Sequence, residues 1–187
     1  MLIERTALPG VLLLTPKRFR DDRGFFCESY NRDVLRAHGI DVAFVQDNHS
    51  LSRKAGTLRG LHFQAPPRAQ AKLIRCGRGR LFDVAVDIRR GAPSYGRWVG
   101  AELSFENGRQ MFIPEGFAHG FVTREPDTEI VYKCSDGYAP DTEGAIRFDD
   151  PQIGIDWGLD GPPGTVSDKD AHAPALRDLS SPFRFEG

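Results

Sequence analysis

The sequence predicts an all-β protein, built as an antiparallel β-barrel or jelly roll with a few short helices. Short strand-like runs, broken by Gly, Pro and Asp turns, follow one another at the spacing of a sandwich or barrel. Several runs alternate between two kinds of residue, as strands with two different faces do. The strand–helix–strand rhythm of a parallel, doubly wound sheet is missing from the sequence.

Strand-like runs fill the chain from about residue 10 to residue 135. They are GVLLLTP, AFVQDNHS, GTLRGLHFQ, AKLIRCG, GRLFDVAVDI, GRWVGAELS, RQMFIPEG, AHGFVTR and EIVYKCS. In GRLFDVAVDI, residues 81, 83, 85 and 87 share one face and residues 82, 84, 86 and 88 share the other. One helix is expected over residues 31–39, with Asn31 as its N-cap and Gly39 at its end. After about residue 150, repeated prolines predict irregular structure with one short helical turn.

Length and composition predict a single domain spanning residues 1–187, with 40% hydrophobic and 27% charged residues. A net charge of -1 provides no general attraction to nucleic acid or to an anionic membrane. Cys27, Cys76 and Cys134 are odd in number and form no CxxC pair, which favours a reducing cytoplasm over a disulfide framework. Residues 1–10 lack a signal-peptide pattern, and residues 11–14 form too short an apolar run to cross a bilayer. We expect a cytoplasmic protein without a membrane segment.

Two histidines are candidates for a catalytic or ligand-binding role. His62 occupies a strand-like run, and His119 lies between residues that favour close backbone approach, in GFAHGF. On local evidence alone a packing role, in which a buried imidazole is tied by hydrogen bonds, is favoured for each. Gly60 and Gln64 stand two positions from His62, so the His-x-His pair of a metal-binding jelly roll is missing. The sequence therefore predicts no metal site.

Further polar residues lie on apolar strand faces. Tyr132 alternates with Ile130 and Cys134, so that it is either a core tyrosine or an acid facing a base across a pocket. Lys72 lies among apolar neighbours, where an ammonium group is costly unless it meets an anion or reaches water. Gln46 and Asn48 share a face and are expected either to bind a polyhydroxylated ligand or to line an exposed edge.

Arg23 and Arg59 are candidates for binding phosphate, with surface ion pairing as the alternative. Strict alternation places Arg59 and His62 on opposite faces of one strand. A bulge at Gly60 would bring them to the same side.

Taken together, these segments resemble the dTDP-4-dehydrorhamnose 3,5-epimerase family of the cupin superfamily. The matching stretches lie in order from about residue 5 to residue 175. They include FRDDRGFF (19–26), QDNHS (46–50), GTLRGLHFQ (56–64), IPEGFAHGF (113–121), YKCSD (132–136), DDPQIGIDW (149–157) and SDKD (167–170). RGLHFQ together with IPEGFAHGF is highly specific.

The resemblance implies a role for each matching residue. His62 would be the catalytic base, paired with Asp170, and Tyr132 would be the acid on the opposite face of the sugar. Lys72 and His119 would stabilise the enolate at the C4 ketone oxygen. Arg59 and Arg23 would hold the diphosphate, with Arg23 reaching in from a neighbouring subunit. The other substrate-contacting positions would be Phe26, Glu28, Gln46, Asn48, Tyr138 (stacked on thymine), Glu143 and Lys169.

This set predicts epimerisation of dTDP-4-dehydro-6-deoxy-D-glucose at C3 and C5, without cofactor or metal, because the ketone itself accepts the electrons. Alternatives are an enzyme that inverts only C3 or only C5, a metal-dependent cupin, and a non-catalytic sugar-nucleotide-binding module. The resemblance also implies a homodimer, in which the apolar VLLL run would reach a partner sheet. Gly137 departs from the family, which often has a bulkier residue before Tyr138, and GPPGTV departs from its usual approach to Asp170.

Overall fold

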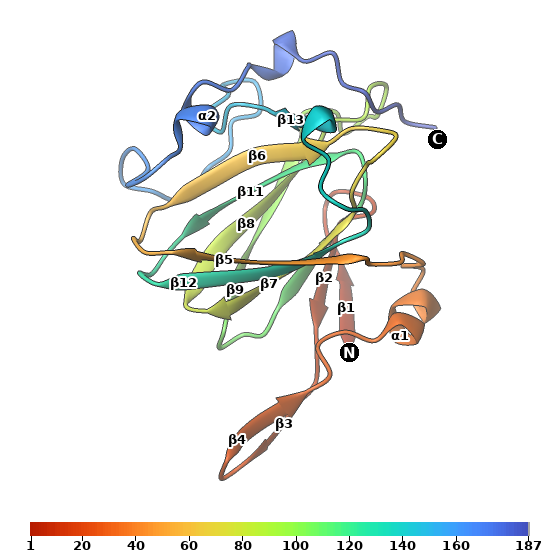
Figure 1. Ribbon diagram of the computed structural model, residues 1–187, viewed down its shortest axis with the longest axis vertical. Coiled ribbons are helices and arrows are strands. Elements are labelled where there is room, and N and C mark those ends of the chain that lie inside the picture. Colours follow the sequence, from red (N-terminus) through yellow and green to blue (C-terminus); the bar gives the residue numbers. More distant parts are fainter. Residues whose placement is uncertain (187) are drawn as a thin grey trace.

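The computed structural model describes residues 1–186 and consists of two facing antiparallel β-sheets with a projecting hairpin (Figure 1). The six-stranded sheet has the order β1 (Leu2–Arg5), β2 (Leu12–Thr15), β10 (Gln110–Ile113), β7 (Lys72–Arg78), β12 (Thr128–Cys134) and β5 (Gln46–Ser52). The five-stranded sheet has the order β13 (Glu143–Ala145), β6 (Leu58–Gln64), β11 (Phe117–Thr123), β8 (Arg80–Asp87) and β9 (Trp98–Ser104). Among residues 1–186 no ladder joins the two sheets, so the predicted β fold is a jelly roll rather than a closed barrel.

The predicted alternation of β8 is confirmed, and both of its faces are buried. Leu81 and Ala85 pack between the two sheets, whereas Val84 and Val86 point to the other side of the five-stranded sheet. An apolar face must be covered on each side, since about 25 cal/mol is gained per Å² of apolar surface removed from water. The strand therefore requires a second layer outside the sandwich.

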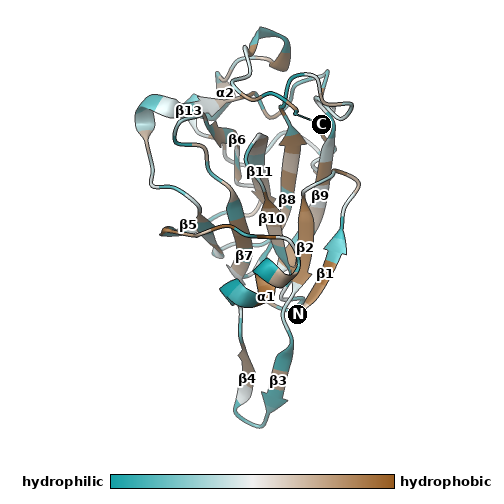
Figure 2. Cartoon of the chain, turned by 90° about the vertical axis from the view of Figure 1, so that its right-hand side faces the viewer, coloured by the Kyte–Doolittle hydropathy of each residue, from teal (hydrophilic) through white to brown (hydrophobic). Residues whose placement is uncertain are grey.

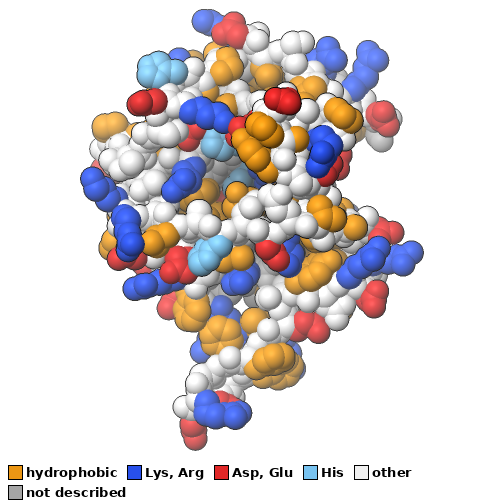
Figure 3. All heavy atoms as spheres, viewed as in Figure 1, with side chains coloured by type: hydrophobic (Ala, Val, Ile, Leu, Met, Phe, Trp, Pro, Cys, Tyr) orange, Lys and Arg blue, Asp and Glu red, His pale blue; other side chains and the backbone are white. Residues whose placement is uncertain are grey.

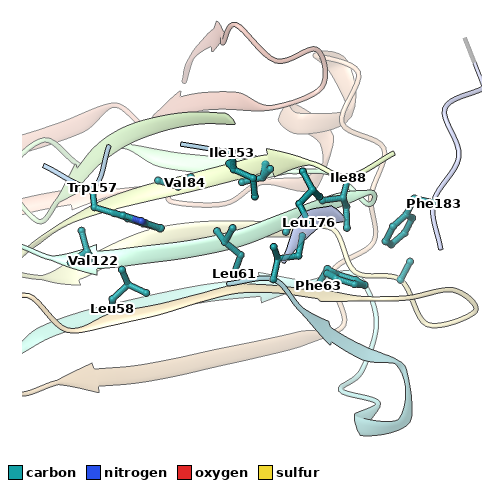
Figure 4. Packing of buried hydrophobic residues seen from close by; sticks show 14 residues of the cluster. Leu58, Leu61, Phe63, Val84, Ile88, Val122, Ile153, Trp157, Leu176 and Phe183 are labelled. Carbon is teal, nitrogen blue, oxygen red and sulfur yellow. The ribbon is translucent and has the colours of Figure 1, made fainter. Parts of the chain in front are cut away.

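The chain after residue 150 provides that layer. Its short turns, α2 (Asp168–Ala171) and η2 (Leu176–Asp178), match the irregular segment expected from the prolines. Ile153, Trp157 and Leu176 pack on residues of β6 and β8, as Figure 4 shows. The segment is thereby fixed against the sheet, and this holds α2 beside β6.

The predicted helix is present as α1 (Arg32–Ala37), and its capping is as expected. The side chain of Asn31 accepts hydrogen bonds from the backbone N–H groups of Asp33 and Val34. Gly39 follows the helix with a φ of 86°, a conformation that favours glycine. Leu35 of the helix is buried on the outer face of the six-stranded sheet.

A hairpin of β3 (Arg18–Asp21) and β4 (Gly24–Cys27) extends away from both sheets (Figures 1 and 2). Most of the VLLL run lies in strand β2. Its strand β2 pairs with β1 and β10 of the same chain, because those two strands satisfy its backbone on both edges. None of the helices within residues 1–186 has the length and apolar composition needed to span a bilayer.

Candidate active site

A cavity of about 420 Å³ lies between the two sheets, at the end covered by the C-terminal segment. This volume falls in the range of small-molecule sites. Figure 3 shows a hollow with histidine side chains inside it and Lys or Arg side chains at its edge. The cavity is lined by Ser50, Thr57, Leu58, Arg59, His62, Lys72, His119, Phe121, Tyr132, Thr165, Val166, Ser167, Lys169 and Asp170. Half of the predicted site residues thus meet around one space.

His62 on β6 forms a dyad with Asp170 of α2. The distance between His62 Nε2 and Asp170 Oδ1 is 2.6 Å, and the second carboxylate oxygen accepts from the backbone N–H of Gly60 at 3.1 Å. Burial alone would raise the pKa of Asp170, but the hydrogen bonds from His62 and Gly60 outweigh it and hold that pKa below its ordinary value. A carboxylate only accepts, so Nε2 carries the proton and Nδ1 keeps a free lone pair. The imidazole is therefore prepared to act as a base.

Gly60 explains how Arg59 and His62 reach the same cavity. Its φ is +130°, and the pairing of β6 with β11 shifts register beside it, so the predicted irregularity is present. A Cβ at this position would lie 2.5 Å from the Cα of Gly120. The two glycines allow the strands to approach closely, and the break in alternation turns Arg59 inward.

His119 on β11 lies directly opposite His62 in the ladder. It forms a second dyad, in which His119 Nε2 donates to Asp83 Oδ1 at 2.7 Å. Asp83 is fully buried, and its other oxygen has no hydrogen-bond partner within the described residues. Asp83 was not among the predicted site residues, although a carboxylate alternating with Leu81 and Ala85 on a buried face is a recognisable signal.

Tyr132 and Lys72 approach the cavity from the six-stranded sheet, on β12 and β7. Burial raises the pKa of the Tyr132 phenol, so the phenol carries its proton at neutral pH. Burial also lowers the pKa of the Lys72 ammonium, against the opposing influence of Cys134 and Asp83. A neutral phenol and the desolvated amino group of Lys72 thus face the two histidines across the sandwich.

A polar cluster lies beside the cavity, next to Lys169. Lys169 donates to Glu143 Oε2 at 2.6 Å, and the hydroxyl of Tyr138 donates to the same oxygen at 3.0 Å. Tyr138 is 59% exposed, and its ring is available for contact with a flat group. Gly137 is packed closely, since a Cβ there would lie 3.1 Å from the guanidinium of Arg68.

Gln46 and Asn48 do not line the cavity wall. They lie on β5 beside Tyr132, where their amides bond to each other and to Cys134. Sequence alternation identified their common face, which Ser50 of the same strand shares and presents to the cavity.

Arg23, Phe26 and Glu28 are not brought to the cavity of their own chain. Arg23 and Phe26 lie on the projecting hairpin and Glu28 just after it, and the Arg23 side chain is 90% exposed. The hairpin turns away from the sandwich of its own chain, so these three residues lie outside this chain's own cavity. Arg23 pairs with Asp21 instead.

The apolar part of the lining was also missed. Leu58, Phe121 and Val166 contribute carbon surface next to the polar groups. Only the contact between separate strands and the C-terminal segment makes them neighbours, so no local signal could have identified them. Within residues 1–186 no three His, Cys, Asp or Glu side chains are grouped as metal ligands.

Comparison with known proteins identifies the family. The sequence model of the dTDP-4-dehydrorhamnose 3,5-epimerases matches residues 5–178. The chain belongs to the dTDP-4-dehydrorhamnose 3,5-epimerase family. Over 177 residues this epimerase is 54% identical to the dTDP-4-dehydrorhamnose 3,5-epimerase of Salmonella typhimurium, covering 94% of this chain and 96% of that one.

Solved structures agree in fold along the whole chain. The dTDP-6-deoxy-D-glucose-3,5-epimerase of Legionella pneumophila, in complex with dTDP-4-keto-L-rhamnose, matches with a TM-score of 0.95 and 43% identity. That match covers 100% of this epimerase and 99% of the other chain. ChmJ, a 3'-monoepimerase from Streptomyces bikiniensis in complex with dTDP-quinovose, matches with a TM-score of 0.86 and 35% identity over 92% and 86% of the two chains.

Proposed function

We propose that the chain epimerises dTDP-4-dehydro-6-deoxy-D-glucose at C3 and C5 to give dTDP-4-dehydro-L-rhamnose. The observation that carries the proposal is the arrangement of a base and an acid, His62 and Tyr132, on facing sheets of one cavity. Inversion requires a proton to leave one side of a carbon and another to arrive on the opposite side. Groups on opposite walls suit this requirement.

In the first step His62 removes a proton from C5 or C3, the two carbons that flank the C4 ketone. The electron pair of the broken C–H bond forms the enolate, so no redox partner is needed. Asp170 holds the imidazole in the required tautomer and stabilises the imidazolium.

The negative charge of the enolate develops on the ketone oxygen. Lys72 brings a desolvated ammonium to the same cavity, and the His119–Asp83 dyad lies beside His62. Charge and donors in a site removed from water stabilise an oxyanion far better than they do in bulk solvent.

In the second step Tyr132 delivers its proton to the other face of the carbon, and the enolate electrons form the new C–H bond. The buried phenol is protonated at neutral pH, which an acid requires. Exchange with solvent then returns the proton from the imidazolium and restores the phenol.

The nucleotide end of the substrate requires further contacts. Arg59 and Lys169 lie at the cavity and suit the diphosphate, and the exposed ring of Tyr138 suits the thymine. Glu143 fixes Lys169 and Tyr138 in place.

We further infer a homodimer in which each hairpin contributes Arg23, Phe26 and Glu28 to the cavity of the other subunit. The exposure of Arg23 and Phe26, far from their own cavity, supports this arrangement. A cytoplasmic location is also our proposal, and the three free thiols of Cys27, Cys76 and Cys134 support it.

Turnover of dTDP-4-dehydro-6-deoxy-D-glucose in deuterated water tests the reaction. Two deuterons in the product, at C3 and C5, are expected, and a single deuteron would instead favour a monoepimerase of the ChmJ kind. His62→Ala should abolish the exchange of both protons. Tyr132→Phe should retain exchange and lose inversion, because the base remains while the acid is gone. Unaltered activity in both variants would contradict the proposal.

A further inference from the structure

Tyr138, with its exposed ring, directly follows a residue that has no side chain. Gly137 has more backbone freedom than any other residue type would have there. Its φ lies outside the left-handed region, so the local turn does not require glycine. A loose segment has to be ordered when a ligand binds, and that ordering lowers affinity. The contacts that hold residues 136–139 therefore bear on how well Tyr138 binds a ligand.

Side chains at the end of β6 and in the loop after it hold this segment from one side. Gln64 is 5% exposed, and its Nε2 donates to the carbonyl oxygen of Gly137 at 3.0 Å. The Oε1 of the same amide accepts from the N–H of Ala139 at 2.9 Å. Gln70 Nε2 donates to the carbonyl oxygen of Asp136 at 2.7 Å. Backbone groups before and after Tyr138 are thus bonded to one loop.

Arg68, in the middle of that loop, grips the carboxylate of Asp136 with two parallel hydrogen bonds. Its Nε donates to Oδ2 at 2.7 Å and its Nη2 to Oδ1 at 2.8 Å. Asp136 Oδ1 also accepts from the N–H of Gly137 at 2.7 Å. A two-bond pair of this kind fixes direction as well as distance, so the guanidinium and the backbone of residues 136 and 137 form one unit.

The same guanidinium covers Gly137. A Cβ at that position would lie 3.1 Å from Arg68 Nη2, and Nη2 lies 3.5 Å from the carbonyl oxygen of Gly137. Arg68 therefore occupies the space that a side chain at position 137 would need. The restraint that Gly137 itself cannot provide comes from a different loop.

We propose that Arg68 is a positioning residue for the nucleotide end of the substrate. By holding Asp136 and covering Gly137, it keeps the ring of Tyr138 oriented for the flat base of a nucleoside diphosphate. This inference rests on the proposed function of Tyr138. Arg68 does not line the cavity around His62, so it acts on binding and not on proton transfer.

The test measures dTDP affinity by titration calorimetry, and steady-state kinetics with dTDP-4-dehydro-6-deoxy-D-glucose, in Arg68→Ala. The Kd for dTDP and the KM should each rise about three- to tenfold, the size expected for an exposed ion pair that preorganises a ligand contact. The kcat should stay within about twofold of the parent value. In a Tyr138→Ala chain the same change should have little further effect, because Arg68 acts through Tyr138.

Two further variants complete the design. Arg147→Ala is the matched control, because Arg147 grips Asp149 with two bonds of 2.7 and 2.9 Å at similar exposure and leaves residues 136–139 untouched. It should bind dTDP as the parent chain does. Asp136→Asn keeps an acceptor for the N–H of Gly137 but weakens the grip of Arg68. Its dTDP affinity should fall by a smaller factor, which keeps the test open if Arg68→Ala fails to fold.

The inference is overturned if Arg68→Ala binds dTDP as tightly as the parent chain, or if kcat falls while KM is unchanged. It is also overturned if Arg68→Ala weakens dTDP binding equally with and without the Tyr138 ring, since Arg68 would then act on the fold in general. Failure of the proposed function looks different, because the parent chain itself would then not epimerise the substrate, whatever its affinity for dTDP.

Discussion

Tyr132 and His62 line one cavity from facing sheets, Tyr132 on β12 of the six-stranded sheet and His62 on β6 of the five-stranded sheet. Their separation is therefore set by the packing of the sandwich and not by a loop. Residues such as Phe121 and Ile130, buried between the sheets, maintain that spacing. The proposed inversion depends on this rigid arrangement.

Asp170→Asn should lower kcat by about 10²- to 10⁴-fold with little change in KM. The carboxylate accepts from both His62 and the Gly60 N–H, whereas an amide has one oxygen and would favour the wrong imidazole tautomer. Steady-state kinetics with the keto-sugar nucleotide measure the effect. Asp168→Asn, in the same short helix but exposed, is the control, and an equal loss in that variant would refute the role of the dyad.

Lys72→Met should reduce turnover by about 10²- to 10³-fold, as expected when a group that stabilises an oxyanion is removed. It should not reduce the free energy of unfolding at neutral pH, because the desolvated ammonium is costly in the folded state. Kinetics and urea unfolding of the same preparation give both quantities. A large loss of stability alongside the loss of activity would mean that Lys72 is structural.

The pH dependence of the parent chain should reflect the same lysine. Burial lowers the pKa of Lys72, so the charged form that stabilises the enolate dominates at low pH and is lost as pH rises through that lowered pKa. Turnover should therefore decline at a pH below the ordinary lysine value of 10.5. The pH–rate profile of Lys72→Met should lack this decline at high pH. If the decline persists in that variant, it belongs to the titration of another group.

Gly60→Ala should destabilise the fold by about 2 kcal/mol or more, because a Cβ would meet Gly120 at 2.5 Å and φ is +130°. Gly24→Ala separates the two causes. Gly24 has a φ of +128°, and nothing lies within 4 Å of a Cβ built there. In urea unfolding, Gly60→Ala should lose more free energy of unfolding than Gly24→Ala. Equal losses would mean that backbone strain alone, without the contact to Gly120, accounts for the effect at Gly60.

Mixing two inactive variants tests the exchange of hairpins between subunits. Arg23→Ala and His62→Ala should each be inactive, and their heterodimer should contain one cavity with both residues intact. After random reassortment about one quarter of the parental sites should be restored. Absence of any recovery, with heterodimers demonstrated by differently tagged chains, would place Arg23 outside the site.

The fold class was accessible from sequence because strand alternation and turns are local signals. The alternation in β8, the Asn31 cap and the break at Gly60 all depend on residues close in the chain. The His62–Asp170 pairing spans 108 positions, and only the resemblance to a family supplied it.

Other parts of the site depend on contacts that no local pattern records. Asp83 is significant because it faces His119 from a neighbouring strand. That Asn48 lies directly opposite Tyr132 follows from the pairing of β5 with β12. The direction of the Arg23 hairpin is equally a tertiary property.

The close approach of Gly60 and Gly120 also has a consequence for engineering. This crossing of β6 and β11 has no room for a side chain on either strand, so libraries that randomise it would yield mostly unfolded proteins. Altered sugar preference is better sought at Val166, a half-buried residue of the C-terminal segment whose carbon surface borders the same chamber.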